Sequence, residues 1–453
     1  MSEAITSRRE RILTQPILPL LIRMSIPTII GMLIMTIYNL TDTFFIGQLG
    51  NKSMTAAIGI AFSFVSFIQA LGFWFGYGSG NSMSRALGAK EEKQAITISS
   101  TGLLLATISG ILLTVLLLPV CESLAAFLGG NASEDLLRYS TEYIRIILYS
   151  VPVSIYATAL YNQIRLCGNA KDAMLGLMLG MLLNMVLDPI FIFTLKMGFV
   201  GAGWATFAGQ VAGASMLTFL SFKNGNIHVS FTKFQLNKTN LYHILIGGAP
   251  NFSRQGITSF AAILLNISAA AYGEEVIAAL TVAGRIAAMC YMVVIGWGQG
   301  FQPICAMNYG AKKYDRVKKA LTLSALVGTI FLIIADIAVF CGAHDLVSLL
   351  TKNPEVAYPA VTILRLQCIS LPLMGIYALS SMFMQNIGRY YTALIISVSR
   401  QGLFYIPLLY ILPLIITGGN PLAIYLVQPL ADIFAFVLGL ILAWPAFRDL
   451  LHN

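Results

Sequence analysis

Two aspartates lie inside long apolar segments of this chain and are its first candidates for chemistry. Asp42 stands in the segment IYNLTDTFFIG, and Asp188 stands in LLNMVLDPIFIF. A charged side chain at the centre of a bilayer costs at least ~2.5 kcal/mol on insertion scales, so an acid in such a segment is expected to have a function. We therefore expect both carboxyl groups to face the interior of the protein.

Polar residues one helical turn from these acids extend the candidate site. Residues four positions apart on a helix share a face. That spacing places Tyr38 with Asp42, Asn184 with Asp188, and Ala202 with Thr206. The resulting set, which we predict to line one ion-coupling cavity, is Tyr38, Asp42, Asn184, Asp188, Ala202 and Thr206.

Two kinds of ion suit this set of side chains. A buried carboxyl group can bind and release a proton, and carboxylates with amide and hydroxyl oxygens can coordinate Na⁺. The residue types leave H⁺ and Na⁺ both open. The structural alternative is that the acids only hydrogen-bond neighbouring helices. Neither reading requires an organic cofactor.

The second half of the chain carries different charges in its apolar segments. Arg254 and Arg285 are basic, and Asp336 and Asp432 stand alone in later segments, so no second pair of acids is visible. Arginine pairs with carboxylates and with anionic ligands. The sequence leaves the roles of these four residues open.

Methionine and aromatic side chains could form an adaptable apolar wall for varied lipophilic ligands. Most such residues in an apolar helix are ordinary packing. We expect a substrate pathway to be lined by such residues and by the polar pair Arg254 and Gln255. The full set is Met35, Phe64, Tyr161, Arg254, Gln255, Met289 and Met292.

The elements that position these residues are membrane-spanning helices. The chain has 453 residues, of which 57% are hydrophobic and only 10% charged, whereas about a quarter of the residues in a soluble domain are charged. The net charge of +9 does not indicate a nucleic-acid partner, because membrane proteins concentrate Lys and Arg in cytoplasmic loops. No GxxxxGK[ST] phosphate loop occurs, so ATP is not the expected energy source.

Apolar runs of about 20 residues, the length that crosses a ~30 Å hydrocarbon core, recur along the whole chain. With the N-terminus inside, eighteen Lys or Arg fall in inner loops and tails and four in outer loops, which predicts cytoplasmic termini in a bacterial plasma membrane. The fold class is thus an all-α integral membrane protein of about twelve helices. The predicted spans are 17–47, 54–81, 95–119, 137–164, 173–195, 200–222, 241–270, 277–308, 320–342, 356–387, 392–416 and 421–447.

An internal repeat divides these helices into two sets. The tripeptide Gly-Ala-Lys at 88–90 recurs 222 residues later at 310–312. Two copies of six helices share one orientation in the membrane and place a substrate path at their interface, which suits alternating access. The predicted organisation is an N-terminal six-helix lobe (1–222), a cytoplasmic connector (223–240) and a C-terminal six-helix lobe (241–453).

Four motifs along the chain resemble the multidrug and toxic compound extrusion (MATE) family. They are DTFFIGQLG at 42–50, NMVLDP at 184–189, GFVGAGWAT at 198–206, and QP at 302–303 leading to NYGA at 308–311. The resemblance covers nearly the whole chain and is strongest to bacterial members of the MepA or DinF-like type.

The resemblance implies two six-helix pseudo-symmetric lobes, a monomer, and export of small lipophilic, often cationic compounds in exchange for H⁺ or Na⁺. It assigns the first-lobe cation site of the family to Asp42, Asn184, Asp188 and Thr206. Members resembling NorM also use a glutamate on the seventh helix and an aspartate on the tenth. This chain has Arg254-Gln255 on the seventh and no acid on the tenth, so that second site is not expected.

Two other functions compete with export of drugs. A flippase for lipid-linked oligosaccharides shares this architecture, but it would need a more cationic central cavity than Arg254 and Arg285 supply. A membrane-embedded enzyme would need a catalytic set, and the four histidines, at 228, 243, 344 and 452, have no clustered partners. We therefore expect a transporter and not an enzyme.

Overall fold

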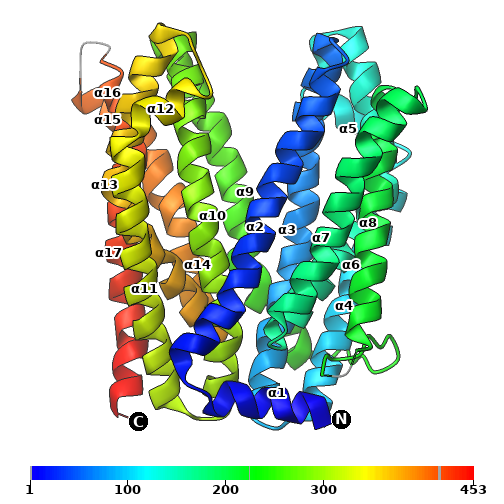
Figure 1. The fold of residues 1–453 in the computed structure, drawn as a ribbon, viewed down its shortest axis with the longest axis vertical. Coiled ribbons are helices and arrows are strands. Elements are labelled where there is room, and N and C mark those ends of the chain that lie inside the picture. Colours follow the sequence, from blue (N-terminus) through cyan, green and yellow to red (C-terminus); the bar gives the residue numbers. More distant parts are fainter. Residues whose placement is uncertain (1–2, 224, 417–419, 453) are drawn as a thin grey trace. The chain divides into compact units, whose positions relative to one another are not determined.

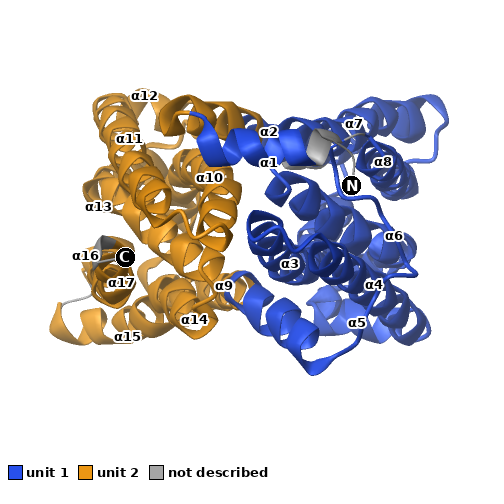
Figure 2. Ribbon diagram, turned by 90° about the horizontal axis from the view of Figure 1, so that it is seen from below, with its two compact units in different colours: residues 1–15, 30–252 blue, residues 16–29, 253–453 orange. Residues whose placement is uncertain are grey.

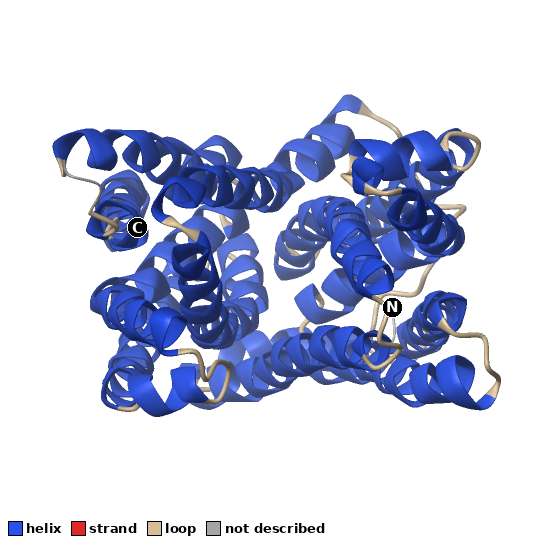
Figure 3. Cartoon of the chain, turned by 90° about the horizontal axis from the view of Figure 1, so that it is seen from above, coloured by secondary structure: helices blue, strands red, loops and turns tan. Residues whose placement is uncertain are grey.

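The computed structural model describes residues 3–223, 225–416 and 420–452. Helices form nearly all of this part of the chain, and it contains no strand (Figures 1 and 3). Eleven helices within it are long and apolar enough to cross a membrane. The predicted all-α membrane fold is confirmed.

The helices of the first half follow the predicted spans closely. They are α1 (Glu3–Thr14), α2 (Ile17–Gly47), α3 (Lys52–Gly88), α4 (Glu92–Leu117), α5 (Cys121–Phe127), the 3₁₀ turn η1 (Gly130–Ala132), α6 (Glu134–Leu166), α7 (Ala170–Pro189), the π-helical turn η2 (Ile190–Thr194) and α8 (Phe199–Ser221). Helix α8 occupies the sixth predicted span, yet it is not among the eleven apolar helices. Its 23 residues are rich in Gly, Ala, Thr and Ser, which lowers its hydropathy.

The second half repeats this order of long and short helices. It contains α9 (Lys238–Ala269), the 3₁₀ turn η3 (Ala270–Tyr272), α10 (Glu274–Gly310), α11 (Tyr314–Cys341), α12 (Ala343–Ser348), α13 (Pro354–Asn386), α14 (Tyr390–Val398), the π-helical segment η4 (Ser399–Tyr405), α15 (Ile406–Ile415), α16 (Leu422–Tyr425) and α17 (Val427–His452).

The bounds of the helices show the internal repeat directly. Helices α3 and α10 both have 37 residues and begin 222 positions apart, and α6 and α13 both have 33 residues and begin 220 positions apart. The repeated Gly-Ala-Lys ends in the same backbone conformation in each copy, because Lys90 and Lys312 have φ angles of 66° and 58°. Equivalent positions can therefore be compared by these displacements.

The described contacts group the chain into two compact units, coloured separately in Figure 2. Unit 1 contains residues 1–15 and 30–252, and unit 2 contains residues 16–29 and 253–453. The unit bounds differ from the predicted lobes, because α2 and α9 each contribute one part to each unit. The predicted division into two lobes and a connector therefore stays a prediction.

Hydrogen bonds explain why these two helices are shared. In unit 2, the Thr28 hydroxyl donates to the carbonyl oxygen of Gly296 at 2.6 Å. In unit 1, the Trp74 indole donates to the carbonyl oxygen of Leu245 at 2.7 Å. Each contact fixes one part of a long helix against a helix of the unit to which that part belongs.

Candidate functional site

The two predicted acids lie close together in unit 1. Asp42 is on α2, and Asp188 is fully buried near the end of α7. The Asp42 carboxylate acts electrostatically on Asp188. Pro189 ends α7, and the π-helical turn η2 follows at once, since proline has no N–H for the regular helical hydrogen bond. The predicted proximity of the two acids is thus present in the structure.

Asn184 connects Asp188 to the neighbouring helix α8. Its amide nitrogen donates to Oδ1 of Asp188 at 3.4 Å and to the hydroxyl oxygen of Thr206 at 3.3 Å. Both bonds are long, which indicates a loosely held amide. Asn184, Asp188 and Thr206 therefore form one polar group between α7 and α8.

Close packing of α7 and α8 brings this group together. A Cβ atom added to Gly180 on α7 would lie 2.7 Å from the carbonyl oxygen of Gly209 on α8. Only glycine permits such an approach of two helix backbones. Asn184 lies one turn after Gly180, so the same contact brings its amide within reach of Thr206.

Three buried oxygen atoms of the site have no hydrogen-bond partner among the residues that the structure describes. They are Oδ1 of Asp42, Oδ1 of Asn184 and Oδ2 of Asp188. Buried polar atoms are nearly always satisfied in native proteins, and two neighbouring carboxylates repel each other when both are charged. These oxygens therefore fit the binding of a proton or of a hard cation such as Na⁺.

Two small cavities adjoin this polar group and share part of their walls. The first has a volume of about 50 Å³ and includes Asp42 and Tyr143 in its lining. The second has a volume of about 70 Å³ and includes Asn184 and Gly180. The residues that line both are Tyr38, Gln69, Ser154, Thr206 and Gln210.

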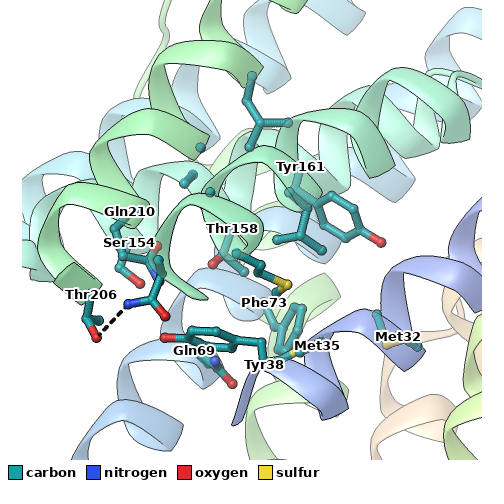
Figure 4. Close-up of a pocket in the computed structure, with 18 residues that line it drawn as sticks. Met32, Met35, Tyr38, Gln69, Phe73, Ser154, Thr158, Tyr161, Thr206 and Gln210 are labelled. Carbon is teal, nitrogen blue, oxygen red and sulfur yellow. Dashed lines mark hydrogen bonds between the residues drawn. The ribbon is translucent and has the colours of Figure 1, made fainter. Parts of the chain in front are cut away.

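Figure 4 shows the second cavity, with the phenol hydroxyl of Tyr38 pointing toward Thr206. Tyr38 and Tyr143 both interact with Thr206 and with the two aspartates. Away from this polar end, the cavity is lined by Met32, Met35, Phe73 and Tyr161. One cavity thus joins the polar group that contains Asn184 and Thr206 to an apolar wall.

Comparison with known proteins identifies the class of molecule that carries this site. A family model described as MatE matches residues 27–190 and 252–411. The chain is 31% identical to the multidrug export protein MepA of Staphylococcus aureus strain MSSA476, over 88% of this chain and 87% of that protein. MepA of Staphylococcus haemolyticus is 28% identical over 86% of this chain and 85% of that protein.

This chain belongs to the MATE family.

Solved structures of MATE proteins have the same fold. An outward-facing multidrug resistance MATE transporter matches with a TM-score of 0.91 at 24% identity, covering 100% of both chains. A MOP superfamily transporter from Pyrococcus furiosus matches with a TM-score of 0.91 at 24% identity, covering 99% of both chains. The predicted MATE resemblance, of the MepA type, is confirmed.

The remaining predicted site residues occupy varied places in this MATE protein. Ala202 is fully buried one turn before Thr206 and lines neither cavity. Phe64 is buried within unit 1 and also lines neither cavity. The predicted pathway residues on α9 and α10 belong to unit 2 and are at least partly exposed; they are Arg254, Gln255, Met289 and Met292.

Several residues of the cavities were missed from the sequence. Gln210 lies one turn after Thr206 on α8, so the four-residue spacing that selected Thr206 could have found it. Gln69 is an amide inside the apolar helix α3, a signal of the same kind as Asn184. Tyr143 and Ser154 on α6 carry no such signal, because polar residues are frequent along that helix.

In unit 2 the sequence also missed Arg400, which pairs with Asp432. Nε of Arg400 lies 2.7 Å from Oδ1 of Asp432, and the guanidinium carbon lies 5.0 Å from the centre of the Tyr291 ring. Gln428 and Ser370 donate to the same carboxylate at 2.6 and 3.0 Å. Arg400 stands alone in the apolar run 390–415, and this alone could have indicated a partner for Asp432.

Proposed function

We propose that this chain exports small lipophilic, often cationic compounds and exchanges them for H⁺ or Na⁺ bound in unit 1. Multidrug export is the activity named for MepA, and the outward-facing MATE structure is described as a multidrug resistance transporter. The observation that carries the coupling part of the proposal is the pair Asp42 and Asp188. They are two adjacent acids with three partnerless buried oxygens around them and no basic partner in either cavity lining.

The shared cavity walls supply a physical link between ion and substrate. Tyr38, Thr206 and Gln210 line both the cavity that contains Asp42 and the cavity that contains the apolar wall. An ion that draws these groups toward the carboxylates changes the wall that a substrate would contact. Coupling of this kind is reciprocal, so bound substrate lowers the affinity for the ion by the same factor.

Charge supports exchange over co-transport. A cation bound between Asp42 and Asp188 removes part of the negative charge of the site and weakens its attraction for a cationic substrate. Release of that ion restores the negative charge. A cationic substrate and the coupling ion are therefore best accommodated in turn.

Transport by purified protein in liposomes tests this function. Ethidium movement is followed while an outwardly or inwardly directed gradient of H⁺ alone or Na⁺ alone is imposed. We expect one gradient to drive ethidium against its concentration, and Asp42→Asn and Asp188→Asn each to lower that rate at least tenfold. Asp135→Asn is the matched control, because Asp135 is exposed and forms an ion pair with the exposed Arg138, three residues on.

The outcomes separate the parts of the proposal. Unchanged ethidium transport in both Asn variants would end the assignment of the coupling site. A lack of ethidium transport together with movement of a phosphorylated lipid-linked sugar would replace drug export by flipping.

The proposal also places the protein as a monomer in the bacterial plasma membrane with both termini in the cytoplasm. The excess of Lys and Arg in the predicted inner loops supports this orientation. A C-terminal green fluorescent protein fusion should then fluoresce, and a C-terminal alkaline phosphatase fusion should be inactive. The reverse pattern would invert the orientation without affecting the ion site.

A further inference from the structure

An open groove in unit 2 contains an acid that the export mechanism does not use. It lies between α11 and α13 and has a volume of about 270 Å³. Most of its lining is apolar: Ile333, Asp336, Ile337, Phe340, Cys341, Cys368, Ile369 and Pro372. Ile337 and Ile369 are 60% and 64% exposed, and apolar side chains exposed on spanning helices face lipid. The groove therefore opens toward the acyl chains of the membrane.

Asp336 is the polar residue of this groove. It is 5% exposed, and neither of its buried carboxyl oxygens accepts a hydrogen bond from an N–H or O–H group of the described residues. Its hydrogen-bonding neighbour is the thiol of Cys368, which is a weak donor. A buried acid held by a weak donor is costly in a membrane, so a ligand that donates stronger hydrogen bonds would relieve that cost.

The first repeat shows that the crossing of these helices does not require an acid. Thr114 on α4 stands 222 residues before Asp336, and Leu148 on α6 stands 220 residues before Cys368. The Thr114 hydroxyl donates to the carbonyl oxygen of Leu148 at 2.8 Å. The equivalent contact in unit 1 is thus satisfied by a hydroxyl donor, whereas Asp336 is held by the weaker thiol donor of Cys368.

A cation packs against Phe340, the residue one helical turn after Asp336. Phe340 follows Asp336 by four residues on α11, so the two share a face and are roughly 6 Å apart. The guanidinium carbon of Arg365 is 5.2 Å from the centre of the Phe340 ring, and its Nε donates to the Phe340 carbonyl oxygen at 3.4 Å. Arg365 is exposed, so its outer nitrogens are open to a ligand.

The depth of Asp336 also matters. Helix α11 has 28 residues, a length of about 42 Å against a hydrocarbon core of ~30 Å. Asp336 lies five residues, about 7.5 Å, before the end of that helix. A centred helix would place it close to the boundary between hydrocarbon and head groups.

We propose that this groove binds a membrane lipid whose head group carries a primary ammonium and a phosphate. The ammonium has three N–H donors for the two oxygens of Asp336, whereas a quaternary ammonium has none. The phosphate meets Arg365, whose guanidinium suits it, and the acyl chains lie along Ile333, Ile337 and Ile369. This groove belongs to unit 2 and is separate from the two cavities beside Asp42 and Asn184 in unit 1.

Lipid retention by the purified full-length protein tests the proposal. The protein is incubated with phosphatidylethanolamine and phosphatidylcholine of identical acyl chains, and bound lipid is counted by native mass spectrometry. We expect wild type to retain the ethanolamine lipid roughly tenfold more than the choline lipid, as befits charge-assisted hydrogen bonds. Asp336→Asn should reduce this ratio to about one, and Arg365→Gln should lower retention of both lipids.

Two further variants keep the result interpretable. Asp336→Glu retains a carboxylate and should keep the preference, which separates loss of charge from loss of folding. Asp345→Asn is the matched control, because Asp345 lies on the exposed surface of α12, and it should leave the ratio unchanged.

Equal retention of both lipids by wild type, or a preference that survives Asp336→Asn, would overturn the proposal. Binding of dodecylamine but not of the ethanolamine lipid would also overturn it and would assign the groove to free amphiphilic amines.

Discussion

Helices α7 and α8 of unit 1 line an open cavity, whereas the corresponding segments of unit 2, η4 and α17, hold an ion pair. In unit 1, Gly180 on α7 and Thr206 and Gln210 on α8 line the second cavity. Arg400 lies 220 positions after Gly180, and Gln428 and Asp432 lie 222 positions after Thr206 and Gln210. Arg400 and Gln428 both bond to the Asp432 carboxylate. Arginine thus stands at 400 where the first repeat has Gly180, and aspartate stands at 432 where the first repeat has Gln210.

The difference shows how one architecture can divide its work. An acid with a guanidinium partner is neutralised permanently, so it stabilises packing and has no need of an ion. The acids of unit 1 have no such partner among the described residues, and we propose that a mobile cation or proton supplies the missing charge. On this proposal, coupling belongs to the repeat in which the helix pair is left open.

The largest effect that tests this comparison is expected from Asp432→Asn. Removal of one partner from a buried ion pair costs about 3–5 kcal/mol, because the other charge remains buried. Arg400 would keep its contact with the Tyr291 ring but lose this carboxylate. The melting temperature of the purified protein, followed by intrinsic fluorescence, should fall clearly.

Asp188→Asn should behave in the opposite way in the same assay. It removes an acid that has no basic partner, so the melting temperature should stay the same or rise slightly. A large fall for Asp188→Asn, or none for Asp432→Asn, would show that the two acids do not differ as described.

Replacement of the whole ion pair comes next in size. Apolar residues of similar volume often substitute for a buried pair without loss of stability. The double variant Arg400→Met with Asp432→Leu should therefore recover most of the stability lost in Asp432→Asn. It should also transport ethidium at a rate near that of wild type, and lost transport in a stable double variant would give the pair a direct part in export.

A smaller effect is expected from Gly180→Ala, which moves unit 1 toward the filled state of unit 2. The added methyl group would lie 2.7 Å from the carbonyl oxygen of Gly209, and overpacking of this kind costs about 1–3 kcal/mol. The helices must separate, which moves Asn184 away from Thr206. Both the melting temperature and the ethidium transport rate should fall.

Gly59→Ala on α3 is the control for the helical glycine itself. Nothing lies within 4 Å of a Cβ atom at that position. Alanine favours a helix by about 0.8–1.0 kcal/mol over glycine, so this variant should be as stable as wild type or more so. Equal behaviour of the two alanine variants would argue against close packing of α7 and α8 as the cause.

Much of the architecture could be predicted from the sequence, because the bilayer imposes long apolar helices. The repeated Gly-Ala-Lys at 88–90 and 310–312 gave the displacement of 222 that relates α3 to α10. Helix α8 was harder to assign by hydropathy, since the small residues that allow close packing are also weakly apolar. The division of α2 and α9 between the units depends on contacts between distant segments, and no local pattern carries that information.

The site was predictable where two polar residues share a helix face. Asn184 with Asp188 and Tyr38 with Asp42 follow from the four-residue spacing. Gln69 and Tyr143 come from single positions on other helices, and only packing brings them to the cavities. The Arg400–Asp432 pair joins residues 32 positions apart, a distance at which sequence spacing says little about contact.

The smallest effect is expected from Thr206→Val, which tests whether the unit 1 site, and not the Arg400–Asp432 pair of unit 2, binds the coupling ion. Valine keeps the shape of threonine but removes the hydroxyl that accepts from Asn184 at 3.3 Å. A net loss of about 0.5–1.5 kcal/mol corresponds to roughly a twofold to tenfold increase in the ion concentration that half-saturates transport. Ion dependence of ethidium exchange in liposomes measures this shift.

Two controls show whether such a shift reflects the ion site. Thr218→Val, three turns further along α8, removes a hydroxyl that bonds to Tyr156 at 2.8 Å, so it should leave the ion dependence unchanged. Gln428→Leu removes the donor to Asp432 at the position equivalent to Thr206. Because that acid remains paired with Arg400, this variant should lower the melting temperature slightly and leave the ion dependence unchanged. A shifted ion dependence in Gln428→Leu would mean that both repeats bind the coupling ion.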